Sequence, residues 1–219
     1  MINYVIFDMD GTLLDTEKLF QKSWNDVGVK WGLEGIEDMY QSIIGRSVDT
    51  IIQMLEEKYG PKTDCYGFFR ARTENFKELI SKEIPIKKGC TELLKFLKEH
   101  NIPMALATST PLYMTENNLA KTGIGEYLDA VVTADMVENG KPAPDIFIEA
   151  GIRIGAKAHE CLVCEDSYNG IRAAYAAGMK PVMIPDMLQP TSEIKQISYA
   201  MVDSLLDVIE LIKKENKII

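Results

Sequence analysis

A short apolar segment that runs directly into two aspartates is the feature that most constrains this chain. Residues 4–7 are Tyr-Val-Ile-Phe, and β-branched and aromatic residues of this kind are typical of a buried strand. In a continued strand, Asp8 and Asp10 would share one face of a hydrophobic sheet, where two carboxylates carry a large desolvation cost. We therefore expect the strand to end at about Asp8 and to lead into a loop that exposes both acids, with Gly11 supplying the backbone freedom for the turn.

An acidic turn that caps the next helix would also place acids after a strand. The D-x-D spacing alone does not separate that structural role from a functional one. The full string, an apolar strand followed by DxDGTLxDT, is far more specific. Two acids at the carboxyl end of a first strand also lie where open α/β sheets place their chemistry.

Two regions of the chain differ in their hydrophobic patterns. Residues 17–82 carry only helical patterns, such as the i, i+3, i+4, i+7 series that starts at Val48. After residue 84, helices alternate with short apolar strands, which are expected at residues 103–107, 130–132, 161–164, 181–184 and 199–202. This alternation predicts an α/β fold with a doubly wound, Rossmann-like parallel sheet. Residues 1–16 and 83–219 are expected to form this core, and residues 17–82 a small inserted helical domain.

The charge of the chain limits its partners. A net charge of -9 and a pI of about 4.9 argue against a nucleic-acid or anionic-membrane surface, although an anionic small molecule needs only a local positive site. The N-terminus shows no signal-peptide pattern, and no apolar run reaches the ~18 residues of a membrane span. We therefore expect a cytoplasmic monomer that acts on a small molecule.

The cysteines are scattered and do not suggest a disulfide framework. Cys161 and Cys164 have C-x-x-C spacing with His159 nearby, but a zinc site would need a second ligand pair, and the two cysteines lie inside an expected strand. We interpret Cys65, Cys90, Cys161 and Cys164 as reduced core thiols.

Polar side chains follow four of the expected strands, and together they suit transfer of a phosphoryl group. After the first strand, one carboxylate of the Asp8 and Asp10 pair can attack phosphorus and form an aspartyl phosphate. The other can protonate the leaving oxygen and later deprotonate a water. These roles require the two acids to lie in different environments.

A hydroxyl group and a cation follow two further strands. Thr108 and Ser109 offer hydroxyl and N–H groups at a helix start, which favours an anion, and Thr110 is expected to cap that helix with Pro111 at its first position. Lys141 stands in the sequence GKPAPD, where two prolines stiffen the loop. A lysine fixed in this way would balance several carboxylates and a phosphate.

The fourth strand end carries Glu165 and Asp166. An acidic helix N-terminus would explain acids at this place, since the helix dipole favours them. Acids close to Asp8 would also repel one another without a metal, and oxygen-only ligands indicate Mg²⁺. We therefore predict a magnesium site here.

The four motifs in this order, DxDGT, a Thr after a strand, GKPAPD and EDS-x-x-G, resemble the signatures of the haloacid dehalogenase-like hydrolase superfamily. The wording of GKPAPDIF and EDSYNGIRAA is similar to that of the capped subfamily containing β-phosphoglucomutase and phosphoglycolate phosphatase. The resemblance implies that residues 17–82 form a helical cap that closes over the site and sets specificity.

The resemblance also implies a role for each matching residue. Asp8 corresponds to the nucleophile and Asp10 to the general acid and base. The expected phosphate contacts are Asp8, Gly11, Thr108, Ser109 and Lys141. The expected Mg²⁺ ligands are Asp8, Asp10 through its carbonyl, Glu165 and Asp166.

The chain departs from β-phosphoglucomutases in the cap. Those enzymes place a histidine where this chain has Phe20 and an arginine after Gly-x-Ser, where Val48 follows Ser47. This departure favours a Mg²⁺-dependent phosphatase of a sugar phosphate or similar metabolite, with a β-phosphoglucomutase-type phosphotransferase as the alternative. The cap offers Arg46, Arg70 and Arg72 as candidate contacts to the leaving group.

A phosphoacceptor module like a response-regulator receiver is a non-enzymatic alternative. Receivers also combine aspartates, a threonine and a lysine on a parallel sheet. Their phosphorylated aspartate lies on a later strand, however, and the helical insertion of residues 17–82 would have no purpose in one. Turnover of any phosphate ester would exclude this alternative.

Overall fold

The computed structural model describes residues 1–44 and 48–218, and it divides into two compact units. One unit comprises residues 1–14 and 86–219 and contains the sheet, and the other comprises residues 15–85 and is helical. Each unit is described by itself.

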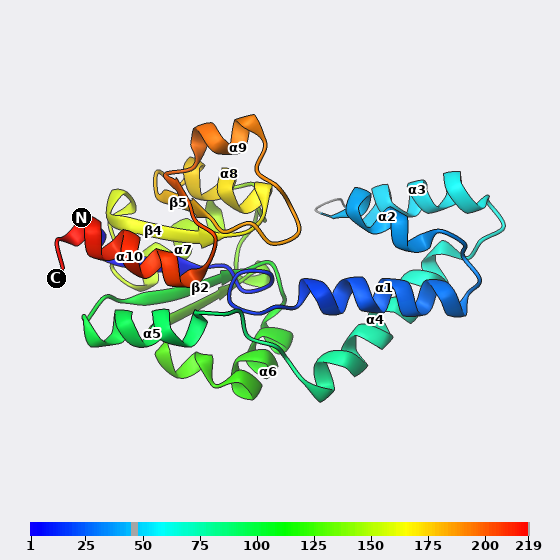
Figure 1. The fold of residues 1–219 in the computed structure, drawn as a ribbon, viewed down its shortest axis with the longest axis horizontal. Helices are drawn as coiled ribbons and strands as arrows, with labels where there is room; N and C mark the ends of the chain where they lie inside the picture. Colours follow the sequence, from blue (N-terminus) through cyan, green and yellow to red (C-terminus); the bar gives the residue numbers. More distant parts are fainter. Residues whose placement is uncertain (45–47, 219) are drawn as a thin grey trace. The chain divides into compact units, whose positions relative to one another are not determined.

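The α/β unit is built on a six-stranded parallel sheet in the order β3-β2-β1-β4-β5-β6 (Figure 1). Its strands are β1 (Tyr4–Phe7), β2 (Met104–Thr108), β3 (Ala130–Thr133), β4 (Cys161–Glu165), β5 (Lys180–Met183) and β6 (Ala200–Met201). β1 lies between β2 and β4, so the strand order reverses around it. In an open α/β sheet, ligands bind outside the carboxyl ends of the strands at such a point.

Helices cover both faces of this sheet. They are α5 (Cys90–Glu99), α6 (Leu112–Thr122), α7 (Asp145–Arg153), α8 (Tyr168–Ala176), α9 (Ser192–Ile197) and α10 (Leu205–Asn216). On one face, Ile6, Ala105 and Val163 pack in a buried cluster with residues of α7 and α8. The alternate strand positions, such as Val5 and Leu106, are equally buried. The predicted doubly wound α/β fold is therefore confirmed.

The helical unit contains α1 (Glu17–Lys30), α2 (Ile36–Ile43), α3 (Val48–Tyr59) and α4 (Cys65–Lys82). α1 packs against both α2 and α4. Trp24 of α1 is buried at the centre, where its ring meets the edge of Phe68 and its Nε1 donates to the Ile36 carbonyl at 2.8 Å.

The two points at which the chain leaves and re-enters the α/β unit lie side by side. The Asp15 N–H donates to the Pro85 carbonyl at 2.8 Å, and the Lys87 N–H donates to the Leu13 carbonyl at 2.9 Å. Between them, Leu14 and Ile86 form an antiparallel bridge. The ends of the insertion therefore meet in a two-stranded connection.

Several sequence expectations need correction. The sequence patterns did not indicate α2 or α9 as separate helices, and β6 covers two residues where four were expected. The cysteine interpretation is confirmed, because Cys65, Cys90, Cys161 and Cys164 are buried free thiols. Within residues 1–44 and 48–218, no helix combines the length and the apolar character that a bilayer crossing needs.

Candidate active site

The loop after β1 separates two carboxylates by one buried side chain. β1 ends at Phe7, and the carbonyl of the fully buried Met9 accepts from the N–H groups of Leu13 and Leu14 at 3.0 and 2.9 Å. This turn leaves the acids at positions 8 and 10 on either side of Met9. The prediction that the strand ends at about Asp8 is therefore confirmed.

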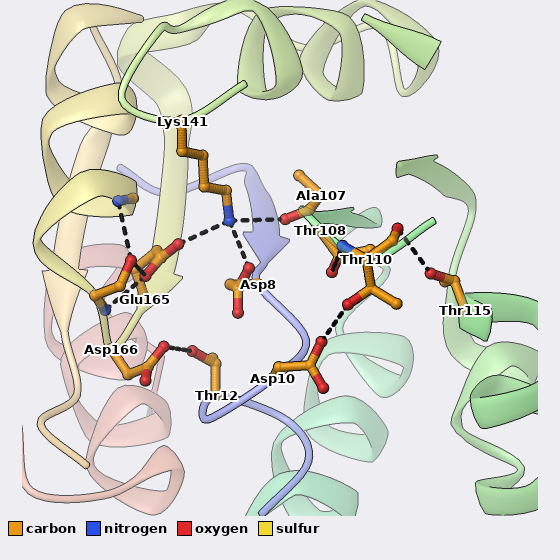
Figure 2. Close-up of polar contacts among 12 residues, drawn as sticks. Asp8, Asp10, Thr12, Ala107, Thr108, Thr110, Thr115, Lys141, Glu165 and Asp166 are labelled. Atoms are coloured by element: carbon orange, nitrogen blue, oxygen red, sulfur yellow. Dashed lines mark hydrogen bonds and ion pairs between the residues drawn. The ribbon is translucent and has the colours of Figure 1, made fainter. Parts of the chain in front are cut away.

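Asp8 is buried, which differs from the expected exposure of both acids. Asp8 is 7% exposed, and Lys141 Nζ lies 2.5 Å from Asp8 Oδ1 (Figure 2). The same ammonium group donates to Glu165 Oε1 at 2.7 Å and to the Ala107 carbonyl at 3.1 Å. The expectation failed because a cation 133 residues away along the chain compensates the buried charge.

Burial and neighbouring charges set the protonation of this pair. Burial raises the pKa of Asp8 to about 8, with further upward contributions from the charges of Glu165 and Asp10 and an opposing one from Lys141. Burial alone would lower the pKa of the Lys141 ammonium, but the carboxylates of Asp8 and Glu165 more than offset this and raise it. Lys141 therefore stays charged between the two acids.

Glu165 links the lysine to the start of α8. Its Oε2 accepts from the Ser167 N–H at 2.8 Å and from the Ser167 hydroxyl at 2.9 Å, while its Oε1 accepts from Lys141. The Gly170 N–H in turn donates to Ser167 Oγ at 3.0 Å. A Cβ at Gly170 would lie 1.7 Å from Glu165 Oε1, so only glycine leaves room for this carboxylate.

Three carboxylates lie close enough to share one cation. Oxygen atoms of Asp8, Glu165 and Asp166 lie within 4.8 Å of one another. The Thr12 hydroxyl donates to Asp166 Oδ1 at 3.3 Å, and a Cβ at Gly11 would lie 2.2 Å from Asp166 Oδ2. Gly11 also has a φ of 84°, which favours glycine. An oxygen-only donor set of this kind fits a hard divalent cation such as Mg²⁺.

The segment after β2 offers hydroxyl groups, and one of them is hydrogen-bonded to Asp10. Thr108 is buried at the end of β2, and its Oγ1 accepts from the Thr110 N–H at 3.1 Å. The Thr110 hydroxyl donates to Asp10 Oδ2 at 2.6 Å. Pro111, rather than Thr110, is the N-cap residue of α6, so the predicted cap is wrong. The sequence Thr108-Ser109-Thr110 could have indicated the contact with Asp10, because a second hydroxyl two residues after Thr108 lies at the same edge of the sheet.

The remaining predicted phosphate contacts are less well defined. Ser109 is exposed next to Thr108. The Gly11 N–H donates to the Leu14 carbonyl at 2.8 Å, so a phosphate contact from Gly11 would have to share this hydrogen bond. Both residues stay predictions.

The predicted arginine contacts belong to the helical unit. Arg46 lies outside the described residues. Arg70 has a side chain that is 75% exposed and lies 4.0 Å from Asp64. Arg72 is partly buried, and its guanidinium lies 5.1 Å from the ring centre of Phe20 and 5.4 Å from that of Phe69. Arg70 and Arg72 therefore have different surroundings.

Arg72 lines a cavity of about 180 Å³ inside the helical unit. The Tyr40 hydroxyl lies 3.2 Å from Glu17 Oε2 at this cavity, and burial lowers the pKa of Arg72 while Tyr40 and Glu17 oppose the shift. The Nε of Arg72 is buried and has no hydrogen-bond partner among the residues that the structure describes. The cavity is lined by Glu17, Phe20, Trp24, Tyr40, Ile43, Ile44, Ile51 and Arg72. Sequence analysis did not identify Glu17 or Tyr40.

Comparisons with known proteins find similar proteins along most of this chain. The family model of the haloacid dehalogenase-like hydrolases matches residues 5–184. The phosphorylated carbohydrates phosphatase of Thermotoga maritima is 34% identical over 178 residues, which cover 81% of this chain and 82% of that protein. The fructose-1-phosphate phosphatase YqaB of Escherichia coli is 35% identical over 179 residues, covering 81% and 94%. The crystal structure of CbbY from Rhodobacter sphaeroides in complex with phosphate has a TM-score of 0.76 at 28% identity, covering 95% of this chain and 96% of that chain.

Proposed function

This chain belongs to the haloacid dehalogenase-like hydrolase family, as its motifs predicted, and we propose that it is a Mg²⁺-dependent phosphatase of a small sugar phosphate or similar metabolite. The prediction that it is an enzyme of this family is confirmed. The observation that carries the proposal is the pairing of Asp8 with Lys141 at the edge of the sheet where Asp10, Thr108 and Asp166 also lie (Figure 2).

The proposed reaction has two steps. In the first, a carboxylate oxygen of Asp8 attacks phosphorus, the bond between phosphorus and the ester oxygen breaks, and Asp10 gives a proton to the leaving alcohol. In the second, a water attacks the aspartyl phosphate, Asp10 takes the proton of that water, and phosphate leaves with Asp8 restored. One phosphomonoester and one water thus give one alcohol and one phosphate.

The other polar residues hold and neutralise the phosphoryl group. Thr108 is the proposed hydroxyl donor to a phosphoryl oxygen, because its Oγ1 accepts from the Thr110 N–H and its own proton can be donated. Lys141 balances the negative charge of Asp8 and of the group that it attacks. Asp8 and Asp166 are the proposed carboxylate ligands of Mg²⁺, with the Asp10 carbonyl. Glu165 could add a ligand atom only by sharing an oxygen with Lys141 or Ser167.

Bound Mg²⁺ would neutralise charge on the phosphoryl group and keep Asp8 ionised at neutral pH. The three carboxylates of Asp8, Glu165 and Asp166, with oxygen atoms within 4.8 Å of one another, support this proposal. Chelation should therefore abolish activity, and added Mg²⁺ should restore it.

We propose that residues 17–82 act as the cap and select the substrate through the cavity at Arg72. A leaving group with several hydroxyls suits this cavity, because the guanidinium donates hydrogen bonds and the carboxylate of Glu17 accepts them. Arg70 is a weaker candidate for a substrate contact, because it is exposed and lies beside Asp64. Arg46 stays a sequence-based candidate.

The central test compares Asp8→Asn with the native enzyme in a phosphate-release screen over a panel of sugar phosphates with Mg²⁺. We expect a loss of at least about 10⁴-fold, because the nucleophile is gone. An acid-stable phosphoenzyme should form on the native chain and be absent from the variant. Asp26→Asn, at an exposed position on α1, is the matched control. Full activity of Asp8→Asn would reject the mechanism.

The panel should include β-glucose 1-phosphate with its bisphosphate primer. The mutase alternative predicts glucose 6-phosphate as the product. Phe20, at the position where the mutases carry a histidine, stacks on Phe76 with ring centres 3.8 Å apart and has no titratable group. We therefore expect release of inorganic phosphate alone.

A further inference from the structure

The hydrogen bond between Thr110 and Asp10 connects two loops that lie 100 residues apart in sequence. The Thr110 hydroxyl lies 2.6 Å from Asp10 Oδ2, which is the usual distance for a hydroxyl that donates to a carboxylate (Figure 2). Asp8 takes its partner from Lys141 instead, so the two acids of one loop are held by chemically different groups.

We propose that Thr110 is a positioning residue for Asp10: its hydroxyl fixes the rotamer of the carboxylate that transfers the proton. This inference rests on the proposed function, in which Asp10 is the general acid and base. Proton transfer depends strongly on the position of the donor, so a carboxylate that rotates freely loses rate even when the group itself is intact.

Thr110 is itself held from both sides. Its N–H donates to Thr108 Oγ1 at 3.1 Å, and its carbonyl accepts from the Thr115 hydroxyl at 3.2 Å. The Thr115 side chain is fully buried, and its hydroxyl shares its proton with the Pro111 carbonyl at 3.1 Å. The backbone of Thr110 is therefore fixed before its hydroxyl reaches Asp10, as a positioning role requires.

The same geometry links phosphate binding to proton transfer. Thr108, the proposed phosphate contact, and Thr110, the proposed anchor of Asp10, are joined by a hydrogen bond within one loop. The loop that would bind the phosphate therefore also holds the carboxylate that would transfer the proton.

The test compares Thr110→Val and Thr110→Ser on two kinds of ester. An alkyl ester, the sugar phosphate hydrolysed fastest in the panel, needs a proton on its leaving oxygen. An aryl ester, p-nitrophenyl phosphate, needs little acid assistance. For Thr110→Val we expect kcat/KM to fall about 10- to 100-fold on the alkyl ester and no more than about threefold on the aryl ester. Thr110→Ser keeps the hydroxyl and should stay within about threefold of the native enzyme on both.

A double-mutant cycle separates positioning from a structural effect. On the aryl ester, the first step of which needs no acid, Thr110→Val should not slow the initial release of p-nitrophenol any further in an Asp10→Asn background. Equal losses on both esters, a further loss in that background, or an unchanged alkyl rate would each overturn the inference. If Thr110→Val does not fold, as judged by thermal unfolding, Thr110→Ala takes its place. The proposed function fails separately, if Asp8→Asn retains activity.

Discussion

Lys141 in the α/β unit and Arg72 in the helical unit differ in their hydrogen-bond partners. In the α/β unit, Lys141 Nζ has three acceptors within 3.1 Å, two of them carboxylates. In the helical unit, Arg72 lies against the rings of Phe20 and Phe69, and its Nε has no hydrogen-bond partner among the described residues. Lys141 already binds acceptors of its own chain, whereas Arg72 has hydrogen-bonding capacity left for a ligand. This difference suggests that chemistry common to every substrate belongs to the first unit and discrimination between substrates to the second.

Among the changes that test this comparison, removal of the Lys141 ammonium should have the largest effect. Lys141→Met leaves Asp8 and Glu165 buried beside each other without a counter-charge. We expect the free energy of unfolding to fall by about 3–5 kcal/mol with a chelator present. We also expect kcat/KM to fall about 10²- to 10³-fold for every substrate in the panel. Denaturant unfolding and the phosphate-release screen measure the two effects.

Lys95→Met, at an exposed position on α5, is the control for Lys141→Met and should change neither quantity. A Lys141→Met enzyme that lost one substrate and kept another would break the comparison between the units. It would show that the lysine takes part in discrimination.

A smaller change in the same unit tests how tightly its charges are packed. Gly170→Ala brings a methyl group within 1.7 Å of Glu165 Oε1, so the carboxylate that binds Lys141 must move from its present position. We expect a loss of about 1–3 kcal/mol in stability and a similar fractional loss of activity on all substrates. Gly151→Ala meets only the terminal methyl of Met179, at 3.2 Å, and is the matched control in α7. Equal thermal stabilities of the two variants would contradict the expectation.

The smallest effect should come from the helical unit and should differ between substrates. Arg72→Ala removes the cation that lines the cavity, whereas Arg70→Ala removes an exposed one. For Arg72→Ala we expect kcat/KM to fall about tenfold on the preferred sugar phosphate and to stay unchanged on p-nitrophenyl phosphate. For Arg70→Ala we expect no change on either. If both variants lowered kcat/KM equally on both substrates, the cavity would have no part in selecting the substrate.

The fold was predictable wherever a residue pattern alone decides the structure. β1 and its end were predicted because apolar residues give way to acids that a core cannot hold. Contacts between distant segments explain the failures. Gly28 lies inside α1 although glycine weakens a helix, and a Cβ there would come within 2.3 Å of Ile36 on α2. The absence of a side chain at Gly28 allows α1 and α2 to pack closely, which the local sequence pattern does not reveal.

The site shows the same limit. Four separate strand ends indicated the residues of the site, because each motif is local to its own loop. The burial of Asp8 was missed, since it depends on Lys141 far along the chain, and the hydrogen bond of Thr110 was missed, since it depends on Asp10. Residue types were thus predictable, whereas the partner of each group required the three-dimensional structure.

The paired connection at Leu14 and Ile86 has an evolutionary consequence. Because the Asp15 N–H and the Pro85 carbonyl are hydrogen-bonded, the insertion begins and ends at almost the same point in space. A segment joined in this way can be lengthened, shortened or exchanged for another without changing the register of β1 and β2. The α/β unit can therefore keep its sheet unchanged while the inserted segment varies in length or sequence.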